Sequence, residues 1–286
     1  MSLGAASGKA VVQSWQLVAM SPVGPEPHGL LSDKRFDQCG GGAHARRVSD
    51  ERGNTMTTIL VTGASRGLGL EFTRQYLAEG RAVVAAARNP GAAHALQQLE
   101  RDSRGRLTLA EVDVADSTSV RGAAARLPGA AIDVLINCAG VFGGEGQAIG
   151  SLDYDAWRRV LEVNVLGPMH VCEAFLERVA RSDRRLIVTI TSGMGSLADN
   201  TSGGYIAYRT SKAAVNMAMR TAAIDLRPRG ITCVVLNPGW VKTDMGGPNA
   251  KLLPEQSVTA MRRVIAKLGP TDSGRFYNHD GREYPW

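Results

Sequence analysis

The chain has 286 residues, 44% hydrophobic and 21% charged, a composition typical of a globular protein and not of a disordered or fibrous one. Its formal net charge of +6 comes from scattered arginines and lysines, which argues against a nucleic-acid binder. The four cysteines form no C-x-x-C pair and the five histidines show no ligand spacing, so we expect no metal site and a reducing, cytoplasmic location. No apolar run approaches the roughly 18 residues that span a bilayer, so we expect no membrane partner.

Residues 1–55 differ from the remainder of the chain. They are proline-rich in their first half, contain the run Gly40-Gly41-Gly42 and lack sustained hydrophobic periodicity, which predicts a largely disordered extension. An alternative is that translation starts at Met56, because a compact apolar strand begins directly after it. We treat residues 56–286 as one domain.

From Met56 onward, short apolar strands alternate with helical stretches. We expect strands over 58–62, 82–87, 107–112, 132–136, 186–191 and 231–236, and a short one near 275–277. We expect helices over 68–79, 92–102, 117–127, 207–226 and 255–268, and one long helix over 152–181 with kinks at Gly167 and Pro168. Asp116 or Ser117 would cap the third helix. The pattern predicts an α/β fold of three layers, a Rossmann-type doubly wound parallel sheet of about seven strands.

The turn between the first strand and the first helix is rich in glycine. Gly63, Gly67 and Gly69 follow a G-x-x-x-G-x-G spacing. Glycine permits the sharp turn and the close approach of a pyrophosphate, and the following helix offers free N–H groups to phosphate. A glycine-rich string alone is weak evidence, but a position between a strand and a helix is the context that confirms a dinucleotide site.

The G-x-x-x-G-x-G spacing resembles the short-chain dehydrogenase/reductase family, and the resemblance covers nearly everything from Met56 to Trp286. The loop 195–204, the following Tyr208-Arg209-Thr210-Ser211-Lys212 and the end of the chain resemble a subgroup of that family. This subgroup includes the bacterial C-factor proteins and the Sniffer-type carbonyl reductases. The family resemblance implies an oxidoreductase that is often a homodimer or homotetramer.

The end of the second strand, Ala86-Ala87-Arg88, lacks the acidic residue that an NAD site usually carries. Arg88 and Arg66 could converge on a 2′-phosphate, with a hydroxyl from Ser65, which predicts NADP(H) as the cofactor. Cys138 stands where the family commonly has asparagine. The family implies further cofactor contacts at Leu68, Asp113, Val114, Asn137, Ala139, Gly140, Tyr208, Lys212, Pro238, Gly239, Val241 and Thr243.

Tyr208 and Lys212 share one face of a predicted helix because they are four residues apart. We expect the Lys212 ammonium to lower the pKa of Tyr208, so that the phenol acts as a general acid near neutral pH. Ser192 ends the fifth strand and would orient a substrate carbonyl. Many relatives place this serine 13 residues before the tyrosine, whereas Ser192 lies 16 before Tyr208 and the rival Ser196 lies 12 before it. We favour Ser192 because it follows the strand directly.

Asn164 matches the family's fourth catalytic position, where it would bend its helix and hold a water in a proton relay toward Lys212. These residues predict an NADPH-dependent enzyme that reduces a small aldehyde or ketone, with 245–254 as a flexible lid. Two alternatives stay open. One is a reductase of 3-oxoacyl groups on a carrier, and the other is a cofactor-bound signalling protein of the C-factor type.

Overall fold

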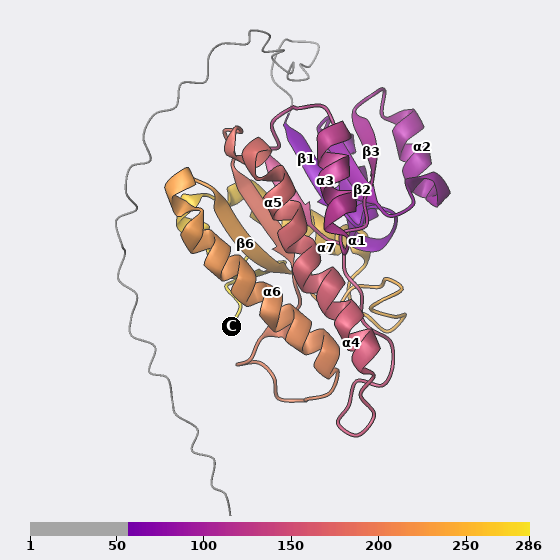
Figure 1. Cartoon of the computed structure of the whole chain (residues 1–286), viewed down its shortest axis with the longest axis vertical. Helices are drawn as coiled ribbons and strands as arrows, with labels where there is room; N and C mark the ends of the chain where they lie inside the picture. The colour runs from indigo at the N-terminus through magenta and orange to yellow at the C-terminus, as the bar shows by residue number, and fades with distance from the viewer. Residues whose placement is uncertain (1–56) are drawn as a thin grey trace, which may run out of the picture. The chain divides into compact units, whose positions relative to one another are not determined.

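The computed structural model describes residues 57–286, so the expectations for residues 1–55 lie outside the described residues. Within the described range, one sheet of seven strands has the order β3-β2-β1-β4-β5-β6-β7 (Figure 1). All six neighbouring pairs are parallel, as predicted. The chain crosses from one edge at β3 to the centre at β4, so the strand order reverses between β1 and β4. That reversal marks the place where open α/β sheets bind their ligands.

Apart from the helix over 152–181, the predicted elements all form, and their ends agree with the structure to within two residues. The strands are β1 Thr58–Thr62, β2 Ala82–Ala87, β3 Leu107–Glu111, β4 Val134–Asn137, β5 Leu186–Ile190, β6 Thr232–Asn237 and β7 Phe276–Asn278. The helices are α1 Gly67–Ala78, α2 His94–Asp102, α3 Ser117–Arg126, α4 Tyr154–Leu161, α5 Gly167–Ala180, α6 Ile206–Asp225 and α7 Pro254–Lys267. The side chain of Asp116 caps α3 by accepting a hydrogen bond from the Thr118 N–H.

The predicted single helix over 152–181 is interrupted, which corrects the sequence interpretation. A π-helical turn, Glu162–Leu166, separates α4 from α5. Pro168 has no N–H and therefore leaves the carbonyl of Asn164, four residues earlier, without its α-helical donor. The Gly167 N–H instead donates to the carbonyl of Glu162, five residues back. The irregularity thus falls one turn before the predicted kinks at Gly167 and Pro168, and it includes Asn164, where a bend was expected.

Two apolar cores cover the two faces of the sheet, because successive strand residues point to opposite faces. Ile59 and Val61 contribute to the core beneath α1 and α7, whereas Leu60 contributes to the core beneath α3, α5 and α6. In Figure 1, α3, α5 and α6 lie in front of the sheet and α7 lies behind it. Every residue of β5 and β6 is buried, which matches their mostly apolar sequences. No helix in residues 57–286 is long and apolar enough to cross a membrane.

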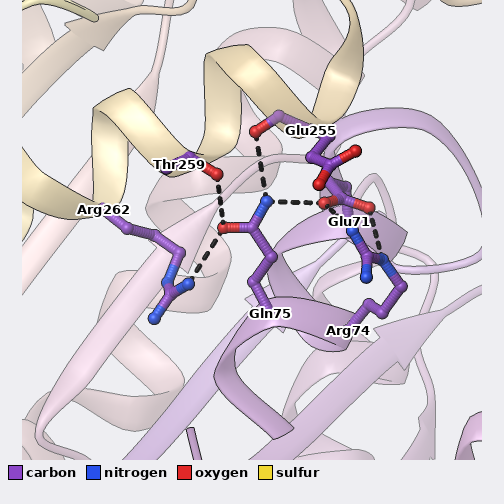
Figure 2. A network of polar contacts seen from close by, with 6 residues as sticks. All are labelled: Glu71, Arg74, Gln75, Glu255, Thr259 and Arg262. Atoms are coloured by element: carbon purple, nitrogen blue, oxygen red, sulfur yellow. Dashed lines mark hydrogen bonds and ion pairs between the residues drawn. The ribbon is translucent and has the colours of Figure 1, made fainter. Parts of the chain in front are cut away.

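A polar network joins α1 to α7 (Figure 2). Gln75 is its centre: its Nε2 donates to Glu71 Oε1 at 2.5 Å and to the Glu255 carbonyl at 3.2 Å. Its Oε1 accepts from Thr259 Oγ1 at 3.2 Å and from Arg262 Nη1 at 2.9 Å. All four contacts satisfy a side chain that is only 7% exposed, so the network fixes the start of α7 against α1.

Candidate active site

The predicted site segments meet at the carboxyl edge of the sheet, each directly after its strand. The turn after β1 is the most tightly constrained of them. A Cβ on Gly63 would lie 2.7 Å from the Cα of Ala139, which follows β4, and a Cβ on Gly69 would lie 2.3 Å from the Gly63 carbonyl oxygen. Glycine is therefore required at both positions. The turn leaves a concave backbone surface of the kind that a pyrophosphate needs.

The start of α1 fits an anionic ligand. The N-cap residue Arg66 makes no side-chain capping bond, and the first turn holds no acidic residue, so the N–H groups and the dipole face outward unneutralised. Arg66 and Arg88 are both exposed, and the end of β2 carries no carboxylate. These features fit a dinucleotide with a 2′-phosphate. Arg66 also binds Asp244, with Nη1 2.6 Å from Oδ2, which links the glycine turn to the segment after β6.

The structure brings Tyr208, Ser192 and Lys212 together. Tyr208 is 7% exposed, and its phenol lies close enough to the Ser192 hydroxyl for that hydroxyl to lower the pKa of the tyrosine. Lys212 donates from Nζ to the Ile190 carbonyl at 3.1 Å and lies 5.7 Å from the centre of the Tyr208 ring. Ser196, the rival serine, instead donates to the backbone oxygen of Trp286 at 3.1 Å. Of the two candidate serines, Ser192 is therefore the one that contacts the tyrosine.

The expected electrostatic effect of Lys212 on Tyr208 is absent from this arrangement. Burial raises the pKa of Tyr208 to about 12, and the hydrogen bond with Ser192 opposes that rise. Burial also lowers the pKa of Lys212 to about 8, because the ammonium loses its hydration. The prediction that Lys212 lowers the pKa of Tyr208 is therefore wrong for the protein alone. The Cys138 thiol beside Lys212 has a pKa raised to about 12 by burial, so it stays protonated at neutral pH.

Asn164 lies in the π-helical turn and is 1% exposed. Its Oδ1 accepts from the Val141 N–H at 2.8 Å, and its Nδ2 donates to the Val141 carbonyl at 2.9 Å and to Ser211 Oγ at 3.0 Å. Both amide hydrogens are thus engaged. A Cβ on Gly140 would lie 3.3 Å from Asn164 Oδ1 and 3.7 Å from Lys212 Nζ. Glycine at this position therefore allows the turn after β4 to lie close to both side chains.

Several predicted cofactor residues make contacts within the protein at the carboxyl edge of the sheet. Asn137 stays a predicted cofactor residue; its buried Nδ2 donates to Thr189 Oγ1 at 3.3 Å and to Cys172 Sγ at 3.4 Å, inside the sheet. Asp113 accepts from the Ala115 N–H at 3.0 Å. Three other predicted positions contact the surrounding framework. Val114 packs beside Gly167 at the start of α5, the Pro238 carbonyl accepts a hydrogen bond from Ser257, and Val241 pairs with Leu252.

The segment after β6 closes the opposite side of the edge. Thr243 Cγ2 lies 3.5 Å from the position of a Cβ on Gly67, so this segment faces the glycine turn. The predicted lid, 245–254, folds back on it, since the Lys242 N–H donates to the Leu252 carbonyl at 2.8 Å. The Trp240 indole also donates to the Gly246 carbonyl at 2.8 Å.

Three supporting contacts escaped the sequence analysis. Thr62 Oγ1 accepts from the N–H groups of Cys138 at 3.0 Å and Ala139 at 3.1 Å, which fixes the turn after β4. Gln147 bonds the backbone of Tyr208 at 2.9 Å. The Tyr284 hydroxyl donates to Asp199 Oδ2 at 2.5 Å, on the loop that follows Ser192. Only Thr62 had a sequence signal, its place directly before the glycine turn.

The family profile described as short chain dehydrogenase matches residues 57–252. The chain belongs to the short-chain dehydrogenase family. This confirms the resemblance drawn from the glycine spacing and from the Tyr208–Lys212 pair. Within residues 57–286, no group of three or more His, Cys, Asp or Glu side chains is placed to hold a metal ion.

Relatives of this short-chain dehydrogenase include both of the protein types in the predicted subgroup. The C-signal protein of Myxococcus xanthus is 51% identical over 155 residues, which cover 54% of this chain and 93% of that protein. The carbonyl reductase Sniffer of D. melanogaster has a TM-score of 0.76 and 32% identity, over 81% of this chain and 100% of its own. An NADPH-bound carbonyl reductase from chicken fatty liver has a TM-score of 0.76 and 34% identity, over 81% and 99% of the two chains.

Proposed function

We propose that this short-chain dehydrogenase uses NADPH to reduce the carbonyl group of a small aldehyde or ketone to an alcohol. The observation that carries the proposal is the cluster of the buried Tyr208 phenol, the Ser192 hydroxyl near it and the buried Lys212 ammonium, whose Nζ lies 5.7 Å from the Tyr208 ring. This cluster lies next to a glycine cradle that fits a dinucleotide. A protein that only bound the cofactor would have no need of two hydroxyls and a buried cation at this edge.

Each residue of the cluster has a role in that reaction. Bound NADPH supplies the hydride. The hydroxyls of Ser192 and Tyr208 bind the carbonyl oxygen and stabilise the negative charge that develops on it. Tyr208 then donates its proton to that oxygen. Lys212 binds the nicotinamide ribose, and the positive charge of the oxidised nicotinamide favours loss of the proton from Tyr208.

Asn164 supports the proton supply in this proposal through its main chain. Its side-chain hydrogens are engaged by Val141 and Ser211. Its carbonyl lacks an α-helical donor because residue 168 is proline. A water bound to that carbonyl would re-protonate Tyr208 by way of Lys212.

The preference for NADPH over NADH rests on charge. Arg66 and Arg88 are exposed at the edge where the adenosine ribose would lie, and no carboxylate follows β2 to bind a 2′-hydroxyl. The NADPH-bound carbonyl reductase from chicken, which shares the fold, agrees with this assignment. A cytoplasmic location and a homodimer or homotetramer stay part of the proposal.

Two other functions remain for the test to decide. Similarity to the C-signal protein favours a signalling role in which the cofactor is bound and not turned over. A reductase of 3-oxoacyl groups on an acidic carrier would use the same Tyr208 chemistry on a larger substrate.

The decisive experiment is NADPH oxidation at 340 nm by residues 56–286 with a panel of aldehydes, ketones, diketones and a 3-oxoacyl thioester. Tyr208→Phe serves as the control, and NADH is run in parallel. We expect turnover with a small carbonyl, a preference for NADPH and a loss of at least about a hundredfold in Tyr208→Phe. Binding of NADPH without turnover of any carbonyl would refute the reductase and favour the signalling role.

A further inference from the structure

The loop that follows β4 contains a buried side chain with an unusual set of partners. Gln147 is 6% exposed. Its Nε2 donates to the carbonyls of Phe142 at 3.0 Å and Gly144 at 2.8 Å, and so closes the loop on itself. Its Oε1 accepts from the Tyr208 N–H at 2.9 Å, and its own carbonyl accepts from the Ile206 N–H at 3.0 Å. One residue of the loop therefore binds two N–H groups in the first turn of α6.

The first turn of α6 needs such a partner because it has no local cap. The N-cap residue is Tyr205, in the left-handed region with φ of 51°, and it makes no side-chain capping bond. The first four N–H groups of a helix lack intrahelical acceptors, and Ser, Thr, Asp or Asn at the N-cap usually supplies one. Gln147 supplies the acceptor from a site 61 residues away in the chain. Without it, the Tyr208 N–H would be buried and unpaired.

The same loop also contacts the aromatic ring of Tyr208. The Phe142 ring lies 4.9 Å from the Tyr208 ring and 5.2 Å from the Tyr205 ring, measured between centroids. Since Gln147 binds the Phe142 carbonyl, it holds this ring in place as well. Both the main chain and the side chain of Tyr208 thus depend on the loop that Gln147 organises.

We propose that Gln147 is a positioning residue for Tyr208, which acts by capping α6 from the loop after β4 and so holds the tyrosine hydroxyl at Ser192. The inference rests on the proposed reductase activity. Reaction rates are sensitive to such placement, because a shift of the reacting group by about 1 Å can lower the rate by about a hundredfold.

The test uses three variants of the full chain. Gln147→Met keeps the length and removes the three side-chain hydrogen bonds, and Gln147→Glu restores the oxygen that accepts from Tyr208. Gln75→Met is the matched control, since Gln75 is 7% exposed, makes four hydrogen bonds and joins α1 to α7 away from Tyr208 (Figure 2). The measurements are kcat and KM for the carbonyl at saturating NADPH, the melting temperature, and amide hydrogen exchange over residues 205–212.

We expect Gln147→Met to lower kcat by about 10- to 100-fold with little change in KM, and to speed exchange over 205–212. Gln147→Glu should recover part of the lost kcat. Gln75→Met should lower the melting temperature comparably and leave kcat within about twofold. Equal kcat in Gln147→Met and Gln75→Met, or unchanged exchange at the start of α6, would overturn the proposal. An inactive wild type would refute the reductase activity and leave the capping role of Gln147 open to test, because hydrogen exchange at the start of α6 does not require turnover.

Discussion

Lys212 is a buried cation whose removal should stabilise the protein while it abolishes activity. Only 6% of the residue is exposed, and burial lowers its pKa from 10.5 to about 8. Each pKa unit corresponds to about 1.4 kcal/mol, so the buried ammonium destabilises the fold by about 3 kcal/mol at pH 7. The hydrogen bond from Lys212 to the Ile190 carbonyl offsets about 1 kcal/mol of this destabilisation. Lys212→Met should therefore raise the free energy of unfolding by about 2 kcal/mol at pH 7.

The stabilisation that Lys212→Met provides should decrease as the pH rises. The folded protein releases the Lys212 proton near pH 8, whereas the unfolded chain keeps it up to about 10.5. Between these values the unfolded state binds more protons, so this group makes the wild type more stable as the pH rises. The advantage of Lys212→Met should be complete below pH 8 and shrink toward pH 10.

The assay is urea unfolding followed by tryptophan fluorescence at pH 7 and pH 9.5. Lys251→Met, at an exposed lysine, is the control and should change stability by less than about 0.5 kcal/mol. A Lys212→Met protein no more stable than the wild type at pH 7 would refute the reasoning. A gain that stays the same at pH 9.5 would refute it too.

Two further predictions concern the cofactor and the substrate loop. Replacing both Arg66 and Arg88 by Ala should raise KM for NADPH by about tenfold or more and leave KM for NADH within about twofold, because only NADPH carries the 2′-phosphate. Steady-state kinetics measures both constants. An equal rise in KM for the two cofactors would show that the arginines do not bind the 2′-phosphate. Tyr284→Phe removes the bond to Asp199 and should speed hydrogen exchange over residues 196–204. Tyr277→Phe, which breaks a similar bond to Asp272, should leave that loop unchanged, and equal exchange in the two variants would contradict the assignment.

The fold was largely predictable because its strands are short, mostly apolar runs in a regular alternation with helices. The π-helical turn was not, since a side-chain pattern does not report a missing main-chain donor. Val160 and Val163 keep the apolar spacing across the break and remain buried. The signal was present in Pro168, but its effect falls four residues earlier, at Asn164.

The site was predictable where a motif fixes it and not where distant segments meet. The glycine turn and the Tyr208–Lys212 spacing carry their own local geometry. The contact of Gln147 with Tyr208 joins residues 61 positions apart, and that of Arg66 with Asp244 joins residues 178 apart. Nothing in the local sequence of either partner indicates such a contact. The direction of the Tyr208 pKa was missed because burial, which depends on the whole fold, raises it.

The central claim is that Tyr208 protonates a carbonyl oxygen while the carbonyl carbon receives hydride from NADPH. The most direct measurement uses NADPH with both C4 hydrogens of the nicotinamide replaced by deuterium, with the best carbonyl of the panel, and determines the mass of the alcohol formed. The proposed reaction predicts one deuterium on the former carbonyl carbon with the wild type, and at least about a hundredfold less labelled alcohol in the same time with Tyr208→Phe. Bound NADPH with no labelled alcohol from the wild type, or equal labelling by Tyr208→Phe, would contradict it.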